Sequence, residues 1–208
     1  MDFQKSIKDF FSKMRTLFAE PEAFFAAVSK EALKPSLYYY SAFLVVTLLI
    51  SYPILGKMVQ PILEQMKITV TTQILIAVLV VSIAFSYLQV FVGIGVTHLL
   101  IKLFKGTKKF VDTAKVMLYG GTPDYILQLL LAIVSVFLFE QLQSMGIALS
   151  IVSVAALAYR FYLQSLGIAQ QHGIDKWKAI LAVFVIPYGI VFLVTLVLRQ
   201  FVPVPTGP

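Results

Sequence analysis

Residues 74–101 read ILIAVLVVSIAFSYLQVFVGIGVTHLLI and contain no Asp, Glu, Lys or Arg. A helix needs about 20 apolar residues to cross a bilayer, so this stretch is long enough to do so. Its apolar residues are continuous and do not alternate with polar ones, which argues against a membrane strand. Similar stretches occupy residues 36–56, 114–139, 147–168 and 177–198. The sequence therefore predicts an all-α polytopic membrane protein, with five transmembrane helices in a membrane domain over residues 36–201.

The composition leads to the same class of protein. Of the 208 residues, 59% are hydrophobic and 13% are charged, and the mean hydropathy is +0.88. Soluble domains are about 45–50% apolar and about 25% charged. These values exclude an ordinary soluble domain, a disordered chain and a nucleic-acid-binding tail, and we expect no nucleic-acid partner. The absence of cysteine excludes disulfides, thiolate metal ligands and cysteine nucleophiles.

The basic residues are distributed unevenly between the two sides of the predicted membrane domain. Thirteen Lys and Arg residues flank the spans on the side of the N-terminus, and three on the other side. Loops rich in Lys and Arg stay in the cytoplasm. We therefore expect a multi-pass cell-membrane protein with a cytoplasmic N-terminus and an external C-terminus. The thirteen residues are Lys5, Lys8, Lys13, Arg15, Lys30, Lys34, Lys102, Lys105, Lys108, Lys109, Lys115, Lys176 and Lys178.

Residues 1–35 precede the first span and carry an amphipathic pattern. Apolar residues recur at helical spacing and charged residues occupy the other side, which indicates an interfacial helix in the plane of the lipid headgroups. The same pattern is typical of a helix packed under the bundle, and both interpretations stay open. A second helix is expected from Pro21 to about residue 32, closed by Lys34-Pro35. The apolar set of the first helix is Phe3, Ile7, Phe10, Phe11, Met14, Leu17 and Phe18.

Three segments outside the spans complete the predicted organisation. The longest external segment covers residues 57–73, where a short interfacial helix can form. Residues 140–146 are expected to form a tight turn. Residues 202–208 form a short external tail that is Pro-rich and too short for a domain.

Four short motifs follow one another along the chain. They are EPEAFF at residues 20–25, Gly106 in the second inner loop, LYGGTP at residues 118–123, and Lys178-Ala179 followed by Ile186-Pro187. In this order, and on a five-span template, the motifs resemble the Yip domain family of Ypt/Rab-GTPase-interacting membrane proteins. The resemblance covers residues 15–200.

The resemblance implies a cytoplasmic N-terminus, an external C-terminus and membership of homo- or hetero-oligomers. Eukaryotic members of the family bind prenylated Rab GTPases and one another, and act in traffic between the endoplasmic reticulum and the Golgi. This chain lacks their long cytoplasmic N-terminal region and its Asp-Leu-Tyr-Gly-Pro type motif. It is therefore more similar to the prokaryotic members, whose function is unassigned, and Rab binding is not carried over.

Asp124 and Arg160 are charged residues expected deep within two of the spans. Each charge near the middle of a membrane costs about 2.5–3.5 kcal/mol. Counted along their helices, both lie about 12–13 Å from the cytoplasmic end, because the two spans run in opposite directions. We therefore expect an intramembrane ion pair between the third and fourth spans. The alternative is that Arg160 extends to the headgroups while Asp124 caps the helix after Pro123.

Gly120, Gly121 and Pro123 are expected to break or kink the third span, and Pro187 the fifth. Discontinuous helices build solute sites in transporters, whereas small residues and prolines also serve close helix packing. Polar side chains near Asp124 can either line a cavity or form hydrogen bonds between helices. They are Gln89, Gln128, Gln164, Tyr119 and Tyr125.

Neither metal nor catalytic chemistry has a supporting motif. His98 and His172 lie near the inner ends of their spans without HExxH or comparable spacing, so we expect no metal and no cofactor. The sequence has no nucleophile elbow and no P-loop, and we assign no catalytic residue. Lys105, Lys108 and Lys109 are expected to contact anionic lipid headgroups, at about 1 kcal/mol each.

Together these features predict a non-enzymatic membrane scaffold or adaptor of the Yip-domain type, in membrane organisation or a trafficking-like process. The bundle would hold the amphipathic N-terminus and the basic loops against the inner leaflet. The alternative is a small solute or ion transporter or channel with a polar site near Asp124 and Arg160. A hydrated cavity reaching Asp124 would favour the transporter, and a dry, apolar neighbourhood would favour the scaffold.

Overall fold

The computed structural model describes residues 3–65, 71–138 and 145–199, and this part of the chain is helical without any strand. The prediction of an all-α protein is therefore confirmed. The elements are α1 (Phe3–Ala19), α2 (Pro21–Val28), α3 (Leu33–Gln65), α4 (Thr72–Leu103), α5 (Phe110–Gly120), α6 (Thr122–Leu138), α7 (Gly146–His172), α8 (Lys176–Ile180), the π-helical segment η2 (Leu181–Val185) and α9 (Ile186–Arg199).

Four helices in the described residues are long and apolar enough to cross a membrane. They are Leu33–Tyr52 within α3, the whole of α4, the whole of α7, and Lys176–Arg199, which runs from α8 through η2 to α9. The pair α5–α6, which bends by 41°, makes a fifth span when it is counted as one. These helices correspond to the five predicted stretches, so the chain is a multi-pass membrane protein.

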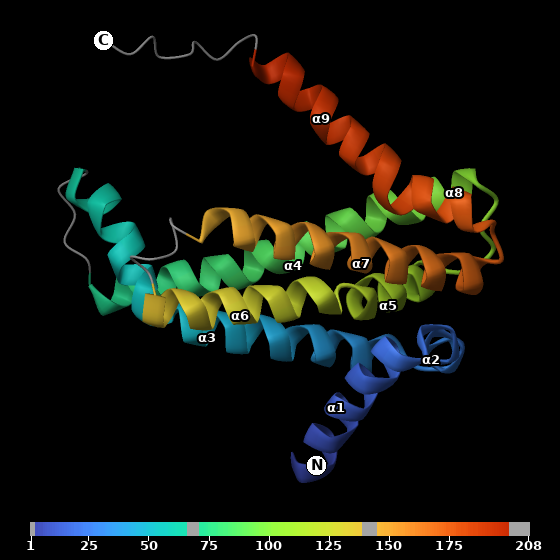
Figure 1. Cartoon of the computed structure of the whole chain (residues 1–208), viewed down its shortest axis with the longest axis horizontal. Helices are drawn as coiled ribbons and strands as arrows, with labels where there is room; N and C mark the ends of the chain where they lie inside the picture. The colour runs from blue at the N-terminus through green and yellow to red at the C-terminus, as the bar shows by residue number, and fades with distance from the viewer. Residues whose placement is uncertain (1–2, 66–70, 139–144, 200–208) are drawn as a thin grey trace.

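Figure 1 shows α3, α4, α5–α6 and α7 side by side as a bundle. At one end of this bundle, where α5 begins and α7 ends, α2 packs against α7; we call it the dock end. From the dock end, α1 projects away from the bundle. Beyond η2, α9 diverges from the other spans, and none of its residues is buried.

The bend between α5 and α6 has a local chemical cause. Pro123 has no N–H to donate to the carbonyl of Tyr119 four residues earlier, and the Thr122 hydroxyl donates to that carbonyl instead. Gly120 lies beside the bend and against α7, where an added Cβ would lie 2.7 Å from Cγ of Gln164. The predicted break is therefore also a point of close packing between the third and fourth spans.

The boundary between the second and third helices differs from the prediction. α2 ends at Val28, and Pro35 lies in the first turn of α3 instead of closing α2. The first N–H groups of a helix have no intrahelical acceptor, so a proline is tolerated there. The backbone of α3 continues to Gln65, so the first part of the predicted external segment 57–73 is helical. Residues 66–70, most of the predicted turn at 140–146 and the tail at 202–208 lie outside the described residues.

α1 divides its apolar residues between two environments. Leu17 is fully buried, and the Phe10 ring stacks on Tyr39 of α3 with the ring centroids 4.8 Å apart. Ile7 and Phe11 stay exposed, at 41% and 57%. α1 therefore packs on the bundle through part of its apolar stripe, and Ile7 and Phe11 keep exposed apolar surface in a groove that they line with Tyr39 of α3.

Candidate functional site

The dock end is built around α2. Phe25 and Val28 of this short helix are buried, and the Phe25 ring lies against Gly167 of α7. A Cβ at Gly167 would lie 3.0 Å from that ring and 2.7 Å from Cγ1 of Val116 on α5. A residue without a side chain therefore allows α2, α5 and α7 to approach closely. We call this contact of α2 with α5 and α7 the dock.

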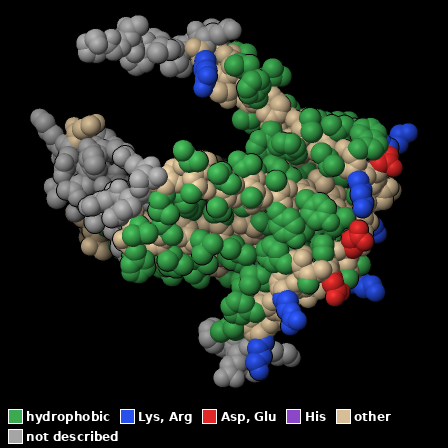
Figure 2. Space-filling view, in the orientation of Figure 1, with side chains coloured by type: hydrophobic (Ala, Val, Ile, Leu, Met, Phe, Trp, Pro, Cys, Tyr) green, Lys and Arg blue, Asp and Glu red, His purple; other side chains and the backbone are tan. Residues whose placement is uncertain are grey.

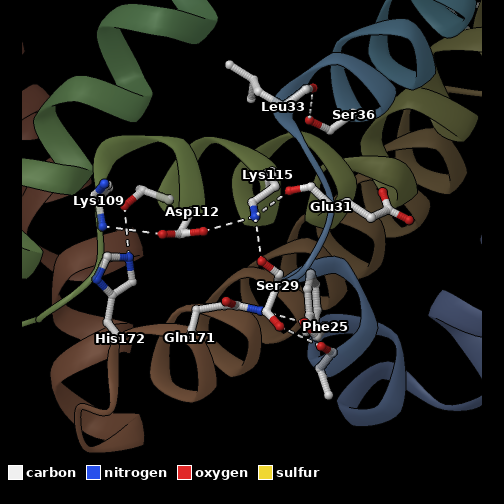
Figure 3. Close-up of polar contacts among 12 residues, drawn as sticks. Phe25, Ser29, Glu31, Leu33, Ser36, Lys109, Asp112, Lys115, Gln171 and His172 are labelled. Atoms are coloured by element: carbon white, nitrogen blue, oxygen red, sulfur yellow. Dashed lines mark hydrogen bonds and ion pairs between the residues drawn. The ribbon is translucent and has the colours of Figure 1, made fainter.

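A buried lysine closes the dock. The Lys115 side chain on α5 is 3% exposed, and its Nζ donates to the carbonyl oxygens of Ser29 and Glu31, each at 3.0 Å (Figure 3). The Asp112 carboxylate lies 2.9 Å from the same Nζ. An ammonium group has three protons to donate, so these three oxygens satisfy it and offset the cost of burying its charge. Lys115 thus ties the chain just after α2 to α5.

Two glutamines at the end of α7 hold α2 from another side. The Gln171 amide donates to the carbonyl of Phe25, and the Gln170 amide donates to the carbonyl of Glu22 at 3.0 Å. The ends of a short helix leave many backbone groups without an intrahelical partner. These side-chain bonds supply additional partners to its carbonyls and fix the position of α2 on α7.

α1 joins the dock through Lys13. Its Nζ donates to the Glu31 carboxylate at 3.0 Å and to the Tyr119 hydroxyl at 3.2 Å. The same carboxylate accepts a hydrogen bond from the Tyr119 hydroxyl at 3.2 Å. Of the two roles that the sequence left open for Tyr119, the structure shows a hydrogen bond between helices, and the hydroxyl lies in the dock, where it helps to orient α1.

Two histidines meet at the dock end through a threonine. Thr113 Oγ1 lies 2.8 Å from Nδ1 of His98 and 2.9 Å from Nε2 of His172, and both Thr113 and His172 are fully buried. A hydroxyl has one proton, so Thr113 donates to one ring at most and accepts from the other. This chain ties α4 and α7 to α5. The part of the chain that the structure describes holds no group of three His, Cys, Asp or Glu side chains arranged for a metal.

A polar cavity of about 310 Å³ lies deeper in the bundle, between α3, α4, α6 and α7. Its wall combines carboxylate, guanidinium, carboxamide and hydroxyl groups with apolar side chains. All the polar residues that the sequence placed near Asp124, except Tyr119, line it. Its polar lining consists of Tyr40, Thr47, Ser86, Gln89, Asp124, Tyr125, Gln128, Arg160 and Gln164.

Asp124 and Arg160 meet at the wall of this cavity. Nη1 of Arg160 on α7 contacts the Asp124 carboxylate in the first turn of α6. Nε of Arg160 donates to Oε1 of Gln164 at 3.4 Å, and Nε2 of Gln164 donates to the Met117 carbonyl at 3.1 Å. The Arg160 and Asp124 side chains are 29% and 15% exposed, so the pair is partly open to the cavity. The structure thus brings the two intramembrane charges together, and Arg160 does not extend away from Asp124.

The Yip1 domain matches residues 15–198, which include the dock, the α5–α6 bend and the cavity. The chain belongs to the Yip1 domain family. No curated protein and no solved structure matches it.

In this Yip1 domain, Gly106 lies where the loop after α4 meets the end of α7. A Cβ at Gly106 would lie 2.3 Å from Cγ2 of Ile101 and 3.2 Å from Nδ1 of His172. The Gly106 N–H also bonds to the Ile101 carbonyl at 2.9 Å. The loop can therefore fold back over the dock end only with a residue as small as glycine at this position.

The other two motifs of the Yip1 domain lie at breaks in spans. At the α5–α6 bend, a Cβ at Gly121 would lie 2.4 Å from the Tyr125 hydroxyl oxygen. Pro187 lies in the first turn of α9, directly after the π-helical segment η2. The missing N–H of a proline removes one intrahelical hydrogen bond, which fits a change of helix type just before it.

Three lysines of the loop between α4 and α5, Lys105, Lys108 and Lys109, are exposed at the dock end. Lys105 has a φ of 65°, the left-handed conformation that favours glycine. It follows the last turn of α4, in the position that glycine commonly takes at a helix end. Figure 2 shows basic side chains at the dock end and on α1, beside a largely apolar surface over the bundle.

The dock is the part of the site that sequence reasoning missed. The sequence counted Lys115 among the basic residues that flank the spans, and this is wrong, because α5 begins at Phe110 and Lys115 is buried within it. The spacing of Asp112 and Lys115 was an available signal, since a carboxylate one turn before a lysine can compensate its charge. No comparable signal marks Gln170 and Gln171, because their acceptors are backbone carbonyls of a distant segment.

Proposed function

We propose that this Yip1-domain membrane protein is a non-enzymatic scaffold or adaptor that holds α1 at the membrane surface for binding a partner. The observation that carries this proposal is the exposed apolar face of α1, with Ile7 and Phe11 at 41% and 57% exposure. The helix that carries these side chains is fixed to the bundle by the buried Leu17 and by Lys13, which bonds to Glu31. The exposed face is therefore offered in one orientation, as an adaptor requires.

The same proposal places the dock end in the cytoplasm and the C-terminus outside, in the cell membrane. Supporting this orientation, the exposed Lys105, Lys108 and Lys109 lie at the dock end, where they can contact anionic headgroups. The bilayer would then be one partner. Association with copies of the chain or with other membrane proteins is supported by α9, whose Phe192 is 62% exposed and which has no buried residue.

The test is affinity capture of the tagged full chain from gently solubilised native membranes, followed by mass spectrometry. We expect a stoichiometric partner with the wild type, and its loss with the double variant Ile7→Ser/Phe11→Ser. Ser12→Ala is the matched control, because Ser12 is an exposed polar residue of the same helix. Ile7 and Phe11 are exposed, so the double variant should keep the elution volume of the wild type. Recovery of the wild-type chain without a partner, also after crosslinking in membranes, would contradict the adaptor.

A second candidate function, a small solute or ion transporter, is favoured by one observation. The cavity of about 310 Å³ reaches Asp124 and Arg160 and has a polar lining. Transport would require a path from this cavity to both faces of the membrane. Flux of a solute into proteoliposomes would support it, provided that the flux is lost when Gln128→Leu removes a carboxamide from the cavity lining.

A further inference from the structure

The cavity has polar side chains where the bundle surface faces the membrane. Gln89 of α4 and Gln128 of α6 both line it, and both are exposed. Along α4, Gln89 lies about 21 Å from Leu103 and about 25 Å from Thr72, which places it near the middle of the span. Acyl chains offer no hydrogen-bond partners. Two exposed carboxamides at such a depth therefore call for a polar neighbour that comes from outside the bundle.

The cavity wall also presents both signs of charge. The Asp124 and Arg160 side chains contact each other and remain 15% and 29% exposed. A ligand with a single charge would meet one group of opposite sign and one of like sign. A zwitterion meets both favourably, and the exposed carboxamides of Gln89 and Gln128 can donate to it and accept from it.

We propose that the cavity binds the headgroup of a zwitterionic phospholipid that carries a primary ammonium group and enters sideways from the bilayer. Its phosphate lies toward Arg160, whose guanidinium suits phosphate oxygens. Its ammonium group lies toward Asp124 and the carboxamide oxygens, because three N–H protons can serve several acceptors. The acyl chains stay in the bilayer beside exposed apolar residues of α4, such as Phe85 and Leu88 at 56% and 59% exposure.

Access from the bilayer fits the structure better than access from the water at the dock end. Tyr119 and Gln164 are 0% and 1% exposed in the bundle near the bend, and the buried Lys115 lies in the dock beyond them. A solute entering there would have to displace these packed side chains. A lipid reaches the exposed Gln89 and Gln128 without disturbing the dock.

The test is native mass spectrometry of the detergent-solubilised full chain, titrated with phosphatidylethanolamine or with phosphatidylglycerol. We expect one bound phosphatidylethanolamine, with an affinity about tenfold above that for phosphatidylglycerol, as the loss of one or two hydrogen bonds or a charge contact would give. Gln89→Leu/Gln128→Leu should remove most of this difference. Ser150→Ala/Thr195→Val is the matched control, because these exposed hydroxyls bond to carbonyls of their own helices and lie outside the cavity.

A charge variant separates a ligand role from a purely structural one. Asp124→Asn leaves Arg160 as the charge of the cavity wall, so the preference should shift toward phosphatidylglycerol, which is anionic. Loss of stability alone would weaken binding of both lipids equally and would not reverse their order. Equal binding of the two lipids by the wild type, or unchanged preference in Gln89→Leu/Gln128→Leu, would overturn the proposal.

The source of the zwitterion is tested with glycerophosphoethanolamine, the soluble headgroup without acyl chains. If it displaces the bound lipid at equal concentration, the ligand is a free solute and the sideways entry is wrong. If it does not, the lipid source stands. Should the double variant fail to elute as a single peak, Gln128→Leu alone takes its place with the same criteria. None of these measurements involves α1, so their outcome is independent of the adaptor function.

Discussion

The dock and the cavity use the same kinds of polar side chain within one apolar bundle. They differ in how far these side chains are exposed and in how many of their hydrogen bonds are made. In the dock, Lys115 is 3% exposed and meets three oxygens. In the cavity, Arg160 is 29% exposed, and Gln128 is exposed beside it. Polar groups whose hydrogen bonds are all made within the protein serve a structural contact, because they have no donor or acceptor left for a ligand. Polar groups with hydrogen-bonding capacity left can bind a ligand. The difference therefore assigns a structural role to the dock end of the bundle and a ligand-binding role to its middle.

The largest expected effect is the loss of Lys115. Lys115→Met leaves the Asp112 carboxylate without its ammonium partner and removes the donor to two carbonyls, so the free energy of unfolding should fall by about 3 kcal/mol. The measurement is denaturation of the purified chain by SDS in mixed micelles. Lys108→Met, at an exposed position, is the control and should change stability by less than about 0.5 kcal/mol. If both variants lose equally little free energy of unfolding, the hydrogen bonds of Lys115 do not stabilise the dock.

Gly167→Ala tests the packing of the dock without touching its charges. The added Cβ would lie 2.7 Å from Val116 and 3.0 Å from the Phe25 ring, and overpacking of this kind costs about 1–3 kcal/mol. Gly95→Ala is the matched control, because nothing lies within 4 Å of its Cβ position. The control should be neutral or stabilising by up to about 1 kcal/mol, since alanine is the better helix former. A neutral Gly167→Ala variant would mean that α2 can shift away from α7 at little cost.

Much of the fold could be predicted because the bilayer imposes long apolar helices, and these are visible in composition alone. The end of α2 could not be placed, because the local sequence around Pro35 fits two positions equally well. A proline can close the preceding helix, or it can lie in the first turn of the next one. The position of α1 could not be decided either. Its apolar stripe is compatible with both environments, and only the contacts of Phe10 with Tyr39 show which face packs on the bundle.

For the candidate site, residues whose position depends on helix rise could be predicted, and those that depend on tertiary contacts could not. Asp124 and Arg160 were placed at similar depth because both were counted along regular helices. The role of Tyr119 stayed open between cavity lining and a hydrogen bond between helices, because only the tertiary fold turns its hydroxyl toward Lys13 and Glu31 at the dock. Gln171 gave no signal at all, since its partner is the carbonyl of Phe25.

A double-mutant cycle on Asp124 and Arg160 sharpens the contrast with Lys115. Asp124→Asn and Arg160→Gln should each lower the free energy of unfolding by about 1–2 kcal/mol, less than in the dock, because the pair is partly exposed to the polar cavity. The double variant should lose less than the sum, with a coupling of about 1 kcal/mol. SDS denaturation again gives the four free energies. Strict additivity would show that the two side chains are neighbours without a stabilising interaction.

The smallest effect is expected at Lys105, at the edge of the dock end. One substitution there should raise the stability of the fold and weaken its contact with lipid. Its φ of 65° is costly for a residue with a Cβ, so Lys105→Gly should raise the free energy of unfolding in detergent by about 1 kcal/mol. The same change removes an exposed cation and should weaken attachment to anionic vesicles by about 1 kcal/mol. Lys108→Ala is the control, and we expect it to lose the lipid contact without the gain in stability. If Lys105→Gly gains stability and keeps its vesicle binding, the lysine has no headgroup role. If both effects appear, the chain keeps a positive charge at a position where glycine would give a more stable fold. That is expected of a surface that contacts lipid and not of a purely structural contact.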